Sequence, residues 1–264
     1  MKLSKRTLRI LKNFSELNYN LFIAKNTNEI GSINTLRSVY SMNVIDEKFE
    51  NEVSIYDTKE FLKMYNSLVD PEITKVDDKF MHIKSKDVSL KYPMSDKSIL
   101  IYPTKSVSMP NKTNYTFKLS KEVLTRILKL AIISGLHDVL FYANGKTLTV
   151  SIVDKNRNGA GEILFLIGKT KDHYRSFHKV YNLSNLLLVD YDVTISSQSI
   201  TMFKNDNEKI TTYIAQEPDS TYLDDAIFKK ELKKKAKVEI QLEKLTSEFY
   251  KKEKELLKLL GRVE

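Results

Sequence analysis

The chain has no cysteine and only 5 prolines in 264 residues. Without cysteine it has no disulfide, no thiolate metal site and no cysteine nucleophile, which fits a cytoplasmic protein. No apolar run approaches the ~20 residues that a membrane helix needs, and the N-terminus is too charged for a signal peptide. With 41% hydrophobic and 10% aromatic residues, the sequence predicts a folded protein with no membrane association and room for one large or two small domains.

The positive charge is unevenly distributed. The formal net charge is +9, and residues 228–264 hold 12 Lys and Arg against 7 Glu, which gives +5 there and leaves +4 for the rest. A modest positive balance is compatible with nucleic-acid binding, but it also fits many unrelated soluble proteins. Charge alone therefore assigns no partner.

The periodicity of apolar residues predicts the secondary structure. Helices are expected over residues 1–18, 58–69, 121–134 and 183–189. Asp57 and Ser120 are the expected N-caps of the second and third helices, and Glu60 is the capping-box partner of Asp57. Strands are expected at residues 21–23, 33–44, 53–56, 80–84, 88–92, 115–119, 139–142, 148–152, 163–167, 193–195, 200–203 and 211–215.

The order of these elements occurs twice and predicts two similar units. Residues 103–114 contain two prolines and many polar residues, which is typical of a connector. Strands in clusters with few βαβ crossovers favour antiparallel sheets with helices on one face, an α+β architecture. We expect a first domain at 1–102, the connector at 103–114, a second domain at 115–225 and a charged helical tail at 226–264.

Three of the predicted helices carry a basic face opposite an apolar face. The basic residues are Lys5, Arg9 and Lys12; Lys59 and Lys63; and Lys121, Arg126 and Lys129. For any single helix a solvated face explains the pattern better, and Glu16, Glu60 and Glu122 dilute each face. Taken together, these eight residues are candidates for sequence-independent contacts with DNA phosphates. No aromatic residue interleaves with them, which argues against a single-strand binder.

The remaining motifs carry no chemistry. His173 and His178 are five residues apart, with no carboxylate spacing to complete a metal site, so surface or core roles are favoured. Residues 158–161 lack the Lys-Ser/Thr of a phosphate loop and predict a turn, and the Asp pairs at 77–78 and 224–225 predict loop charges. We therefore expect no catalytic, cofactor-binding or metal-binding residue, and no enzyme.

The C-terminal segment has an apolar seam within a charged helix. Leu242, Leu245, Phe249, Leu256, Leu259 and Val263 follow a seven-residue period that only Lys252 breaks. Docking of this seam onto a partner surface is favoured over a solvated tail, because an unpartnered seam stays exposed to water. Truncation after Asp225 then changes the affinity for a partner peptide.

Three sequence anchors resemble the T4-type phage sliding clamps, the rings that hold a replicative polymerase on DNA. The first is the Met-Lys-Leu-Ser-Lys opening with Leu-Lys-Asn-Phe at 11–14. The second is Ile-Tyr-Asp at 55–57 with Phe61 and Leu62. The third is Tyr-Ile-Ala at 213–215 with Asp-Ser-Thr at 219–221. Their order and spacing extend the resemblance from Met1 to about Asp225.

This resemblance implies a subunit of two clamp domains that forms a homotrimeric ring around duplex DNA in an infected bacterial host cell. It implies a DNA polymerase processivity factor loaded by a clamp loader, and a co-activator of late viral transcription. By position, the partner pocket of the family falls on Val107, Met109, Pro110, Tyr213 and Ile214; ordinary core roles are the alternative. The tail and the basic body both depart from the family pattern. A non-encircling accessory or architectural duplex-DNA-binding protein remains the alternative function.

Overall fold

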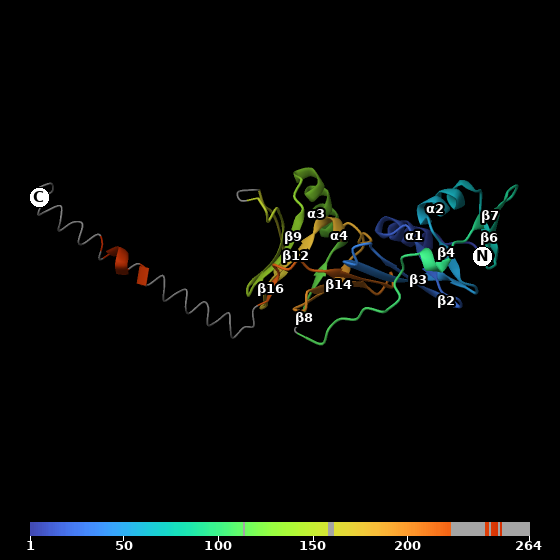
Figure 1. Cartoon of the computed structure of the whole chain (residues 1–264). Coiled ribbons are helices and arrows are strands. Elements are labelled where there is room, and N and C mark those ends of the chain that lie inside the picture. Colours follow the sequence, from blue (N-terminus) through green and yellow to red (C-terminus); the bar gives the residue numbers. More distant parts are fainter. Residues whose placement is uncertain (113, 158–160, 223–240, 243, 248, 250–264) are drawn as a thin grey trace, which may run out of the picture.

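The order of elements along the chain is helix, four strands, helix, three strands, and this order occurs twice (Figure 1). The computed structural model describes residues 1–112, 114–157, 161–222, 241–242, 244–247 and 249. The first set comprises α1 (Lys5–Leu17), β1 (Leu21–Ile23), β2 (Thr27–Ile33), β3 (Val39–Phe49), β4 (Val53–Ile55), α2 (Thr58–Ser67), β5 (Glu72–Val76), β6 (Phe80–Lys84) and β7 (Ser89–Pro93).

A short 3-10 helix (Lys97–Ile99) and an extended segment lead to the second set. It begins with one additional strand and ends with another. Its elements are β8 (Asn114–Leu119), α3 (Lys121–Ser134), β9 (Asp138–Asn144), β10 (Thr147–Val153), β11 (Ile163–Lys169), β12 (His173–Lys179), α4 (Val180–Leu183), β13 (Tyr191–Ser196), β14 (Ile200–Asn205), β15 (Ile210–Ala215) and β16 (Thr221–Tyr222).

The helices begin where the sequence places a capping side chain. Ser4 Oγ accepts a hydrogen bond from the backbone N–H of Thr7 at the start of α1, and Asp57 Oδ1 accepts one from Glu60 at the start of α2. Ser120 Oγ accepts a longer one, 3.3 Å, from Val123 at the start of α3. Each bond satisfies one of the free N–H groups of the first turn.

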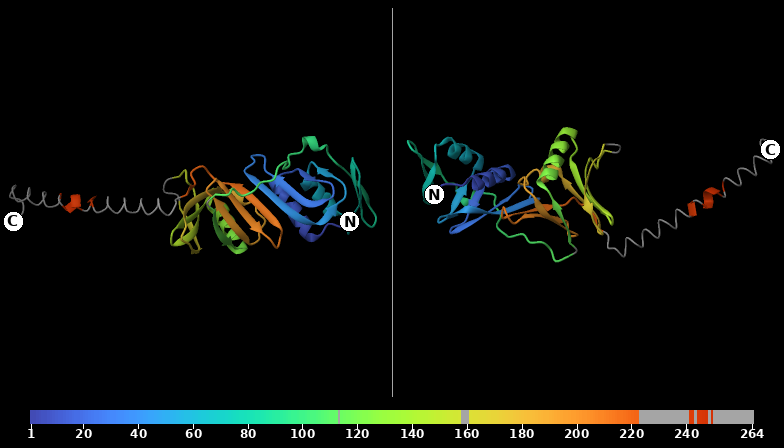
Figure 2. Two further views of the ribbon diagram at one scale, coloured as in Figure 1. Left: turned by 90° about the horizontal axis from the view of Figure 1, so that it is seen from below. Right: turned by 180° about the vertical axis from the view of Figure 1, so that it is seen from behind.

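All strand pairs among the described residues are antiparallel. The largest sheet has the order β2-β3-β15-β14-β13-β8, so the pairing of β3 with β15 joins the two halves of the chain. A second sheet has the order β11-β10-β9-β12-β16, and a third is β5-β6-β7. The helices lie on one side of the strands, and the view from below presents the strands themselves (Figures 1 and 2).

Two hydrophobic clusters fill the spaces between helices and sheets. One takes its residues from 3–92 and includes Ile10, Leu11 and Phe14 of α1 with Phe61 of α2. The other is formed by residues 115–214, with Leu17 and Val39 added from the first half. The apolar side predicted for α1 is therefore buried, and Lys5, Arg9, Lys12 and Glu16 are exposed on the opposite side.

Two elements differ from the sequence prediction. The run at 33–44 is not one strand, because Asn34 Oδ1 accepts hydrogen bonds from the backbone of Ser38 and Val39 and closes a turn between β2 and β3. The helix predicted at 183–189 is wrong: α4 occupies Val180–Leu183 and is followed by turns. Strands β5, β12 and β16 were not predicted from the sequence, and β2 was missed except for its last residue, Ile33.

Most of the predicted tail at 226–264, the Asp pair at 224–225 and most of the turn at 158–161 lie outside the described residues. In the described part of the tail, Leu242, Leu245 and Phe249 are exposed and helical. No helix in the described ranges is long and apolar enough to cross a membrane.

Candidate nucleic-acid interface

A groove of about 550 Å³ runs between α1 and α2. The two helices contact each other, and the groove is lined by residues from 8 to 16 of α1 and from 59 to 66 of α2. Its lining residues are Leu8, Arg9, Lys12, Ser15, Glu16, Lys59, Leu62, Lys63 and Asn66. The structure therefore brings four of the eight predicted DNA-binding residues into one site; Lys5 lies outside its lining, at the first position of α1.

Among the described residues, two of the four cations that line the groove are paired with a carboxylate, and two are not. Arg9 Nη2 lies 2.6 Å from Glu208 Oε2, and Lys59 Nζ donates a 2.6 Å hydrogen bond to Glu16 Oε2. The hydrogen bond to Glu16 raises the pKa of Lys59. Lys12 and Lys63 form no ion pair within the part of the chain that the structure describes, so their charges are available to a ligand.

The remaining three predicted residues lie on α3. Lys121, Arg126 and Lys129 are exposed and make no ion pair with any described residue. The Arg126 guanidinium lies 5.4 Å from the centroid of the Phe165 ring of β11, which orients the side chain. Figures 1 and 2 place α3 on the same side of the sheets as α1 and α2. Asn13 Nδ2 links α1 to this region by donating to the Asn185 carbonyl after α4.

Aromatic rings accompany two of these cations, which the sequence pattern did not reveal. In addition to Phe165 below Arg126, the exposed ring of Tyr19 lies 5.6 Å from Lys59 Nζ. These rings do not alternate with the charges as a series of stacking platforms. The surface consequently offers several cations to a polyanion, and it provides no row of aromatic side chains for unpaired bases.

The predicted partner-binding residues occupy two segments. Val107, Met109 and Pro110 are half-buried in the extended segment before β8. Tyr213 is half-buried on β15, and its ring centroid lies 6.0 Å from that of Tyr40. Ile214 points to the other face of the sheet and is 0% exposed, so its position is that of a core residue. The structure brings Tyr213 next to Tyr40, a neighbour that sequence reasoning did not identify.

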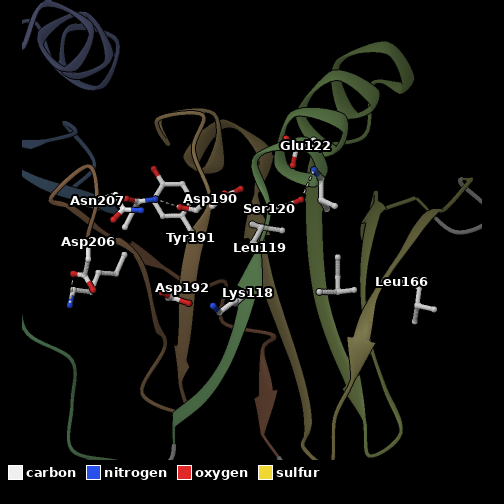
Figure 3. A pocket seen from close by; sticks show the side chains of 14 residues that line it. Lys118, Leu119, Ser120, Glu122, Leu166, Asp190, Tyr191, Asp192, Asp206 and Asn207 are labelled. Atoms are coloured by element: carbon white, nitrogen blue, oxygen red, sulfur yellow. Dashed lines mark hydrogen bonds and ion pairs between the residues drawn. The ribbon is translucent and has the colours of Figure 1, made fainter. Parts of the chain in front are cut away.

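A second cavity, of about 650 Å³, is unsuited to phosphates (Figure 3). It lies at the start of α3 and between β8, β11, β13 and β14, and none of the predicted site residues lines it. Its charged lining residues are Lys118, Lys204, Glu122, Asp190, Asp192 and Asp206. Four carboxylates against two ammonium groups repel a polyanion. No group of three or more His, Cys, Asp or Glu in the described ranges is placed to hold a metal ion.

His178 is a core histidine. It is fully buried on β12, and its Nε2 lies 3.0 Å from Ser176 Oγ and 3.2 Å from Thr201 Oγ1. Burial lowers its pKa to about 3, so the side chain is neutral at physiological pH. In the first half, Asp77 accepts hydrogen bonds from His82 and from the backbone of Lys79 and Phe80, which lower the pKa of its carboxyl. Both arrangements stabilise local structure.

The fold is that of the sliding clamps. Two solved structures that resemble it are the proliferating cell nuclear antigen (PCNA) of Thermococcus kodakaraensis and the PCNA of A. fulgidus bound to the C-terminal region of FEN-1. Each has a TM-score of 0.61. They share 15% and 11% sequence identity with this chain and cover 81% and 83% of it; 98% of each solved chain is covered.

Among known sequences the chain is similar to the sliding clamps of T4-type phages, as its three anchors predicted. It is 27% identical to the sliding clamp of Escherichia phage RB69 over 235 residues, which are 84% of this chain and 99% of that protein. It is 24% identical to the sliding clamp of Vibrio phage KVP40 over 210 residues, which are 77% of this chain and 94% of that protein. No family model matches the chain.

Proposed function

We propose that this chain is the subunit of a homotrimeric sliding clamp that encircles duplex DNA during phage DNA replication and tethers a DNA polymerase to it. The similarity to phage clamps over 84% of the chain supports this function. We further propose two clamp domains at 1–102 and 115–225, with 103–114 as their connector. In this role the protein catalyses no reaction.

The observation that carries the proposal is the junction between β3 and β15. β3 is the third strand after α1, and β15 is the third strand after α4. The repeated order makes β11 and β7 their counterparts, since β11 is the third strand after α3 and β7 is the third after α2. Each of these two strands has one unpaired edge within the described residues. A second copy can therefore repeat the junction by pairing its β7 with β11.

The surface of β11 supports such a contact. Leu164 and Leu166 are 61% and 70% exposed. Exposed leucines on a strand with a free edge favour association with another chain. A head-to-tail contact of this kind closes into a ring when a whole number of the rotations that relate neighbouring copies makes one full turn. We propose three subunits, because six clamp domains are needed to surround a duplex.

The mechanism is topological. A closed ring remains linked to DNA while it slides, and the helix cations supply weak attraction to phosphates of any sequence. Tethering raises the effective concentration of polymerase at the primer end. Because a ring has to open to admit DNA, we include an ATP-driven clamp loader among the partners.

We propose that partner peptides bind between the connector residues Val107, Met109 and Pro110 and the face of β15 that carries Tyr213. The PCNA of A. fulgidus, which has the same fold, was solved with the C-terminal region of FEN-1 bound. Polymerase and clamp loader are the proposed occupants, and a late-transcription factor is a further one. Polymerase-peptide affinity of Tyr213→Ala, measured by titration calorimetry, tests this site.

Two measurements test the ring. Light scattering should give a mass of about three times the 30.6 kDa chain; a monomer mass at every concentration contradicts the trimer. After loading, the protein should be retained on closed circular DNA and lost when the circle is cut. A non-encircling duplex binder shows no difference between the two forms of DNA, so equal retention would favour that alternative.

A further inference from the structure

Two of the four cations that line the groove between α1 and α2 already have a carboxylate partner. Arg9 and Lys59 are each 2.6 Å from a carboxylate oxygen, of Glu208 and Glu16 respectively. Lys12 and Lys63, on the same two helices, have no such partner among the described residues. Half of the positive charge that faces the groove is thus already neutralised by the protein itself.

Glu208 reaches Arg9 from the distant turn between β14 and β15. This turn has a separate attachment to α1, because Arg6 Nη2 donates to the Glu208 carbonyl and Arg6 Nε lies 3.4 Å from the Glu208 carboxylate. Oε2 of Glu208 is close to Arg9 but makes no well-aligned hydrogen bond. Arg9 is therefore held by charge attraction, and the turn does not depend on it.

Glu16 and Lys59 connect the two helices at the surface of the groove. Their side chains are exposed to 58% and 35%, so water screens their attraction. Exposed ion pairs of this kind contribute little to stability and exchange partners at low cost. A phosphate that approaches Lys59 thus competes with the Glu16 carboxylate on nearly equal terms, whereas Glu208, whose side chain is 23% exposed, is the more shielded competitor at Arg9.

We propose that Glu16 and Glu208 are positioning residues that limit the attraction of the groove for duplex DNA, a proposal that rests on the sliding-clamp function. As DNA moves past the groove, Arg9 and Lys59 return to their carboxylates between one phosphate and the next. Because the cations always have a partner, the interaction energy between protein and DNA differs less from one position along the duplex to the next. The carboxylates lower affinity and make the protein slide more freely.

The test uses full-length protein and a labelled blunt duplex of mixed sequence, with fluorescence anisotropy measured over a range of salt concentrations. Glu16→Gln should tighten binding by about two- to fivefold at low salt, the worth of one exposed ion pair. Glu208→Gln should tighten binding in the same direction, because it removes the carboxylate partner of Arg9. The slope of log affinity against log salt should steepen by about one for each freed cation. Diffusion along DNA should become slower. Thermal melting reports whether either variant disturbs the fold.

Glu60→Gln is the matched control, because Glu60 is exposed on α2 and forms no ion pair with described residues. It changes net charge equally without releasing a cation. If both groove variants behave like this control, the competitor proposal is overturned. The double variant Lys12→Glu with Lys63→Glu tests separately whether the groove binds DNA. If it loses binding, the groove faces DNA even when the glutamate variants have no effect. If its binding is unchanged, the groove does not face DNA.

Discussion

The helical surfaces of the two halves differ although the order of their elements is the same. In the first half, α1 and α2 have 13 and 10 residues and form a groove with paired and unpaired cations between them. In the second half, α3 has 14 residues and α4 only 4. The end of α3 presents Ile132 and Ile133, which are 77% and 79% exposed. The repeated topology thus preserves the order of strands, while the second helix of each half differs in length, 10 residues in α2 against 4 in α4.

The largest expected effect compares buried and exposed apolar residues of α1 and α3. Phe14→Ala removes a ring that is buried between α1 and the first core cluster, so it should lower the free energy of unfolding by about 3–5 kcal/mol. Ile132→Ala should change it by less than about 0.5 kcal/mol. Urea denaturation measures both. A large loss in the Ile132 variant would mean that this end of α3 is covered, for example by another subunit.

Charge reversal tests whether the groove between α1 and α2 and the exposed face of α3 both contact DNA. Lys12→Glu with Lys63→Glu, and separately Arg126→Glu with Lys129→Glu, should each impair processive synthesis and reduce the salt dependence of DNA binding by about one for each residue. The first pair should leave stability nearly unchanged. The second should also lose the contact with Phe165, about 0.5–1 kcal/mol. If one pair has no effect on synthesis, the wall that carries it does not face DNA.

Acid sensitivity should be concentrated in the second half, at His178. Its pKa is about 3 in the folded protein and about 6.5 in the unfolded chain, so the unfolded state takes up a proton first as pH falls. Stability should therefore decrease from pH 6.5 towards 3, by up to about 1.4 kcal/mol per pH unit from this group. Above pH 6.5 the group contributes no pH dependence.

His178→Gln is the control for this effect, because it removes the titrating group and should flatten the pH dependence of the unfolding midpoint over the same range. An equally steep acid slope in the variant would assign the sensitivity to other groups. Asp77, whose pKa is lowered by His82 and two backbone N–H groups, stabilises the fold above its unfolded pKa. This contribution is lost only at lower pH, and solvent screens it.

The smallest expected effect compares the helix caps. Asp57 Oδ1 accepts from Glu60 N at 2.9 Å, and Ser120 Oγ accepts from Val123 N at 3.3 Å. Asp57→Ala should cost about 1 kcal/mol of stability, and Ser120→Ala should cost less because the longer bond is weaker. Equal losses of stability in thermal unfolding would show that the length of the capping hydrogen bond does not determine how much each N-cap contributes.

Local signals were sufficient for several elements of the fold. α2 and α3 combine a capping side chain with apolar residues at helical spacing, and β6 has alternating buried residues, so each was predicted near its observed bounds. β12 was missed because it contains two histidines, Arg175 and Lys179, although Ser176 and His178 are buried. Its burial depends on neighbouring strands, which no local pattern reveals.

The candidate site was predictable only in part for the same reason. Cations at helical spacing identified Arg9, Lys12, Lys59 and Lys63 individually. That α1 and α2 meet in a groove depends on packing, and so does the approach of Glu208, which lies on a turn 202 residues from Arg6. Long-range ion pairs of this kind leave no periodic signal in the sequence.

The pairing of β3 with β15 also has a consequence for synthesis of the chain. Ser41 and Thr212 hydrogen-bond across this junction at 2.7 Å and are 171 residues apart. At a usual translation rate, roughly 10–30 s pass between the emergence of the two strands from the ribosome. During that time one edge of β3 has no partner, and free strand edges promote aggregation. The N-terminal half cannot complete its largest sheet until nearly all of the described strands have been made, so a fragment of residues 1–102 expressed alone should aggregate.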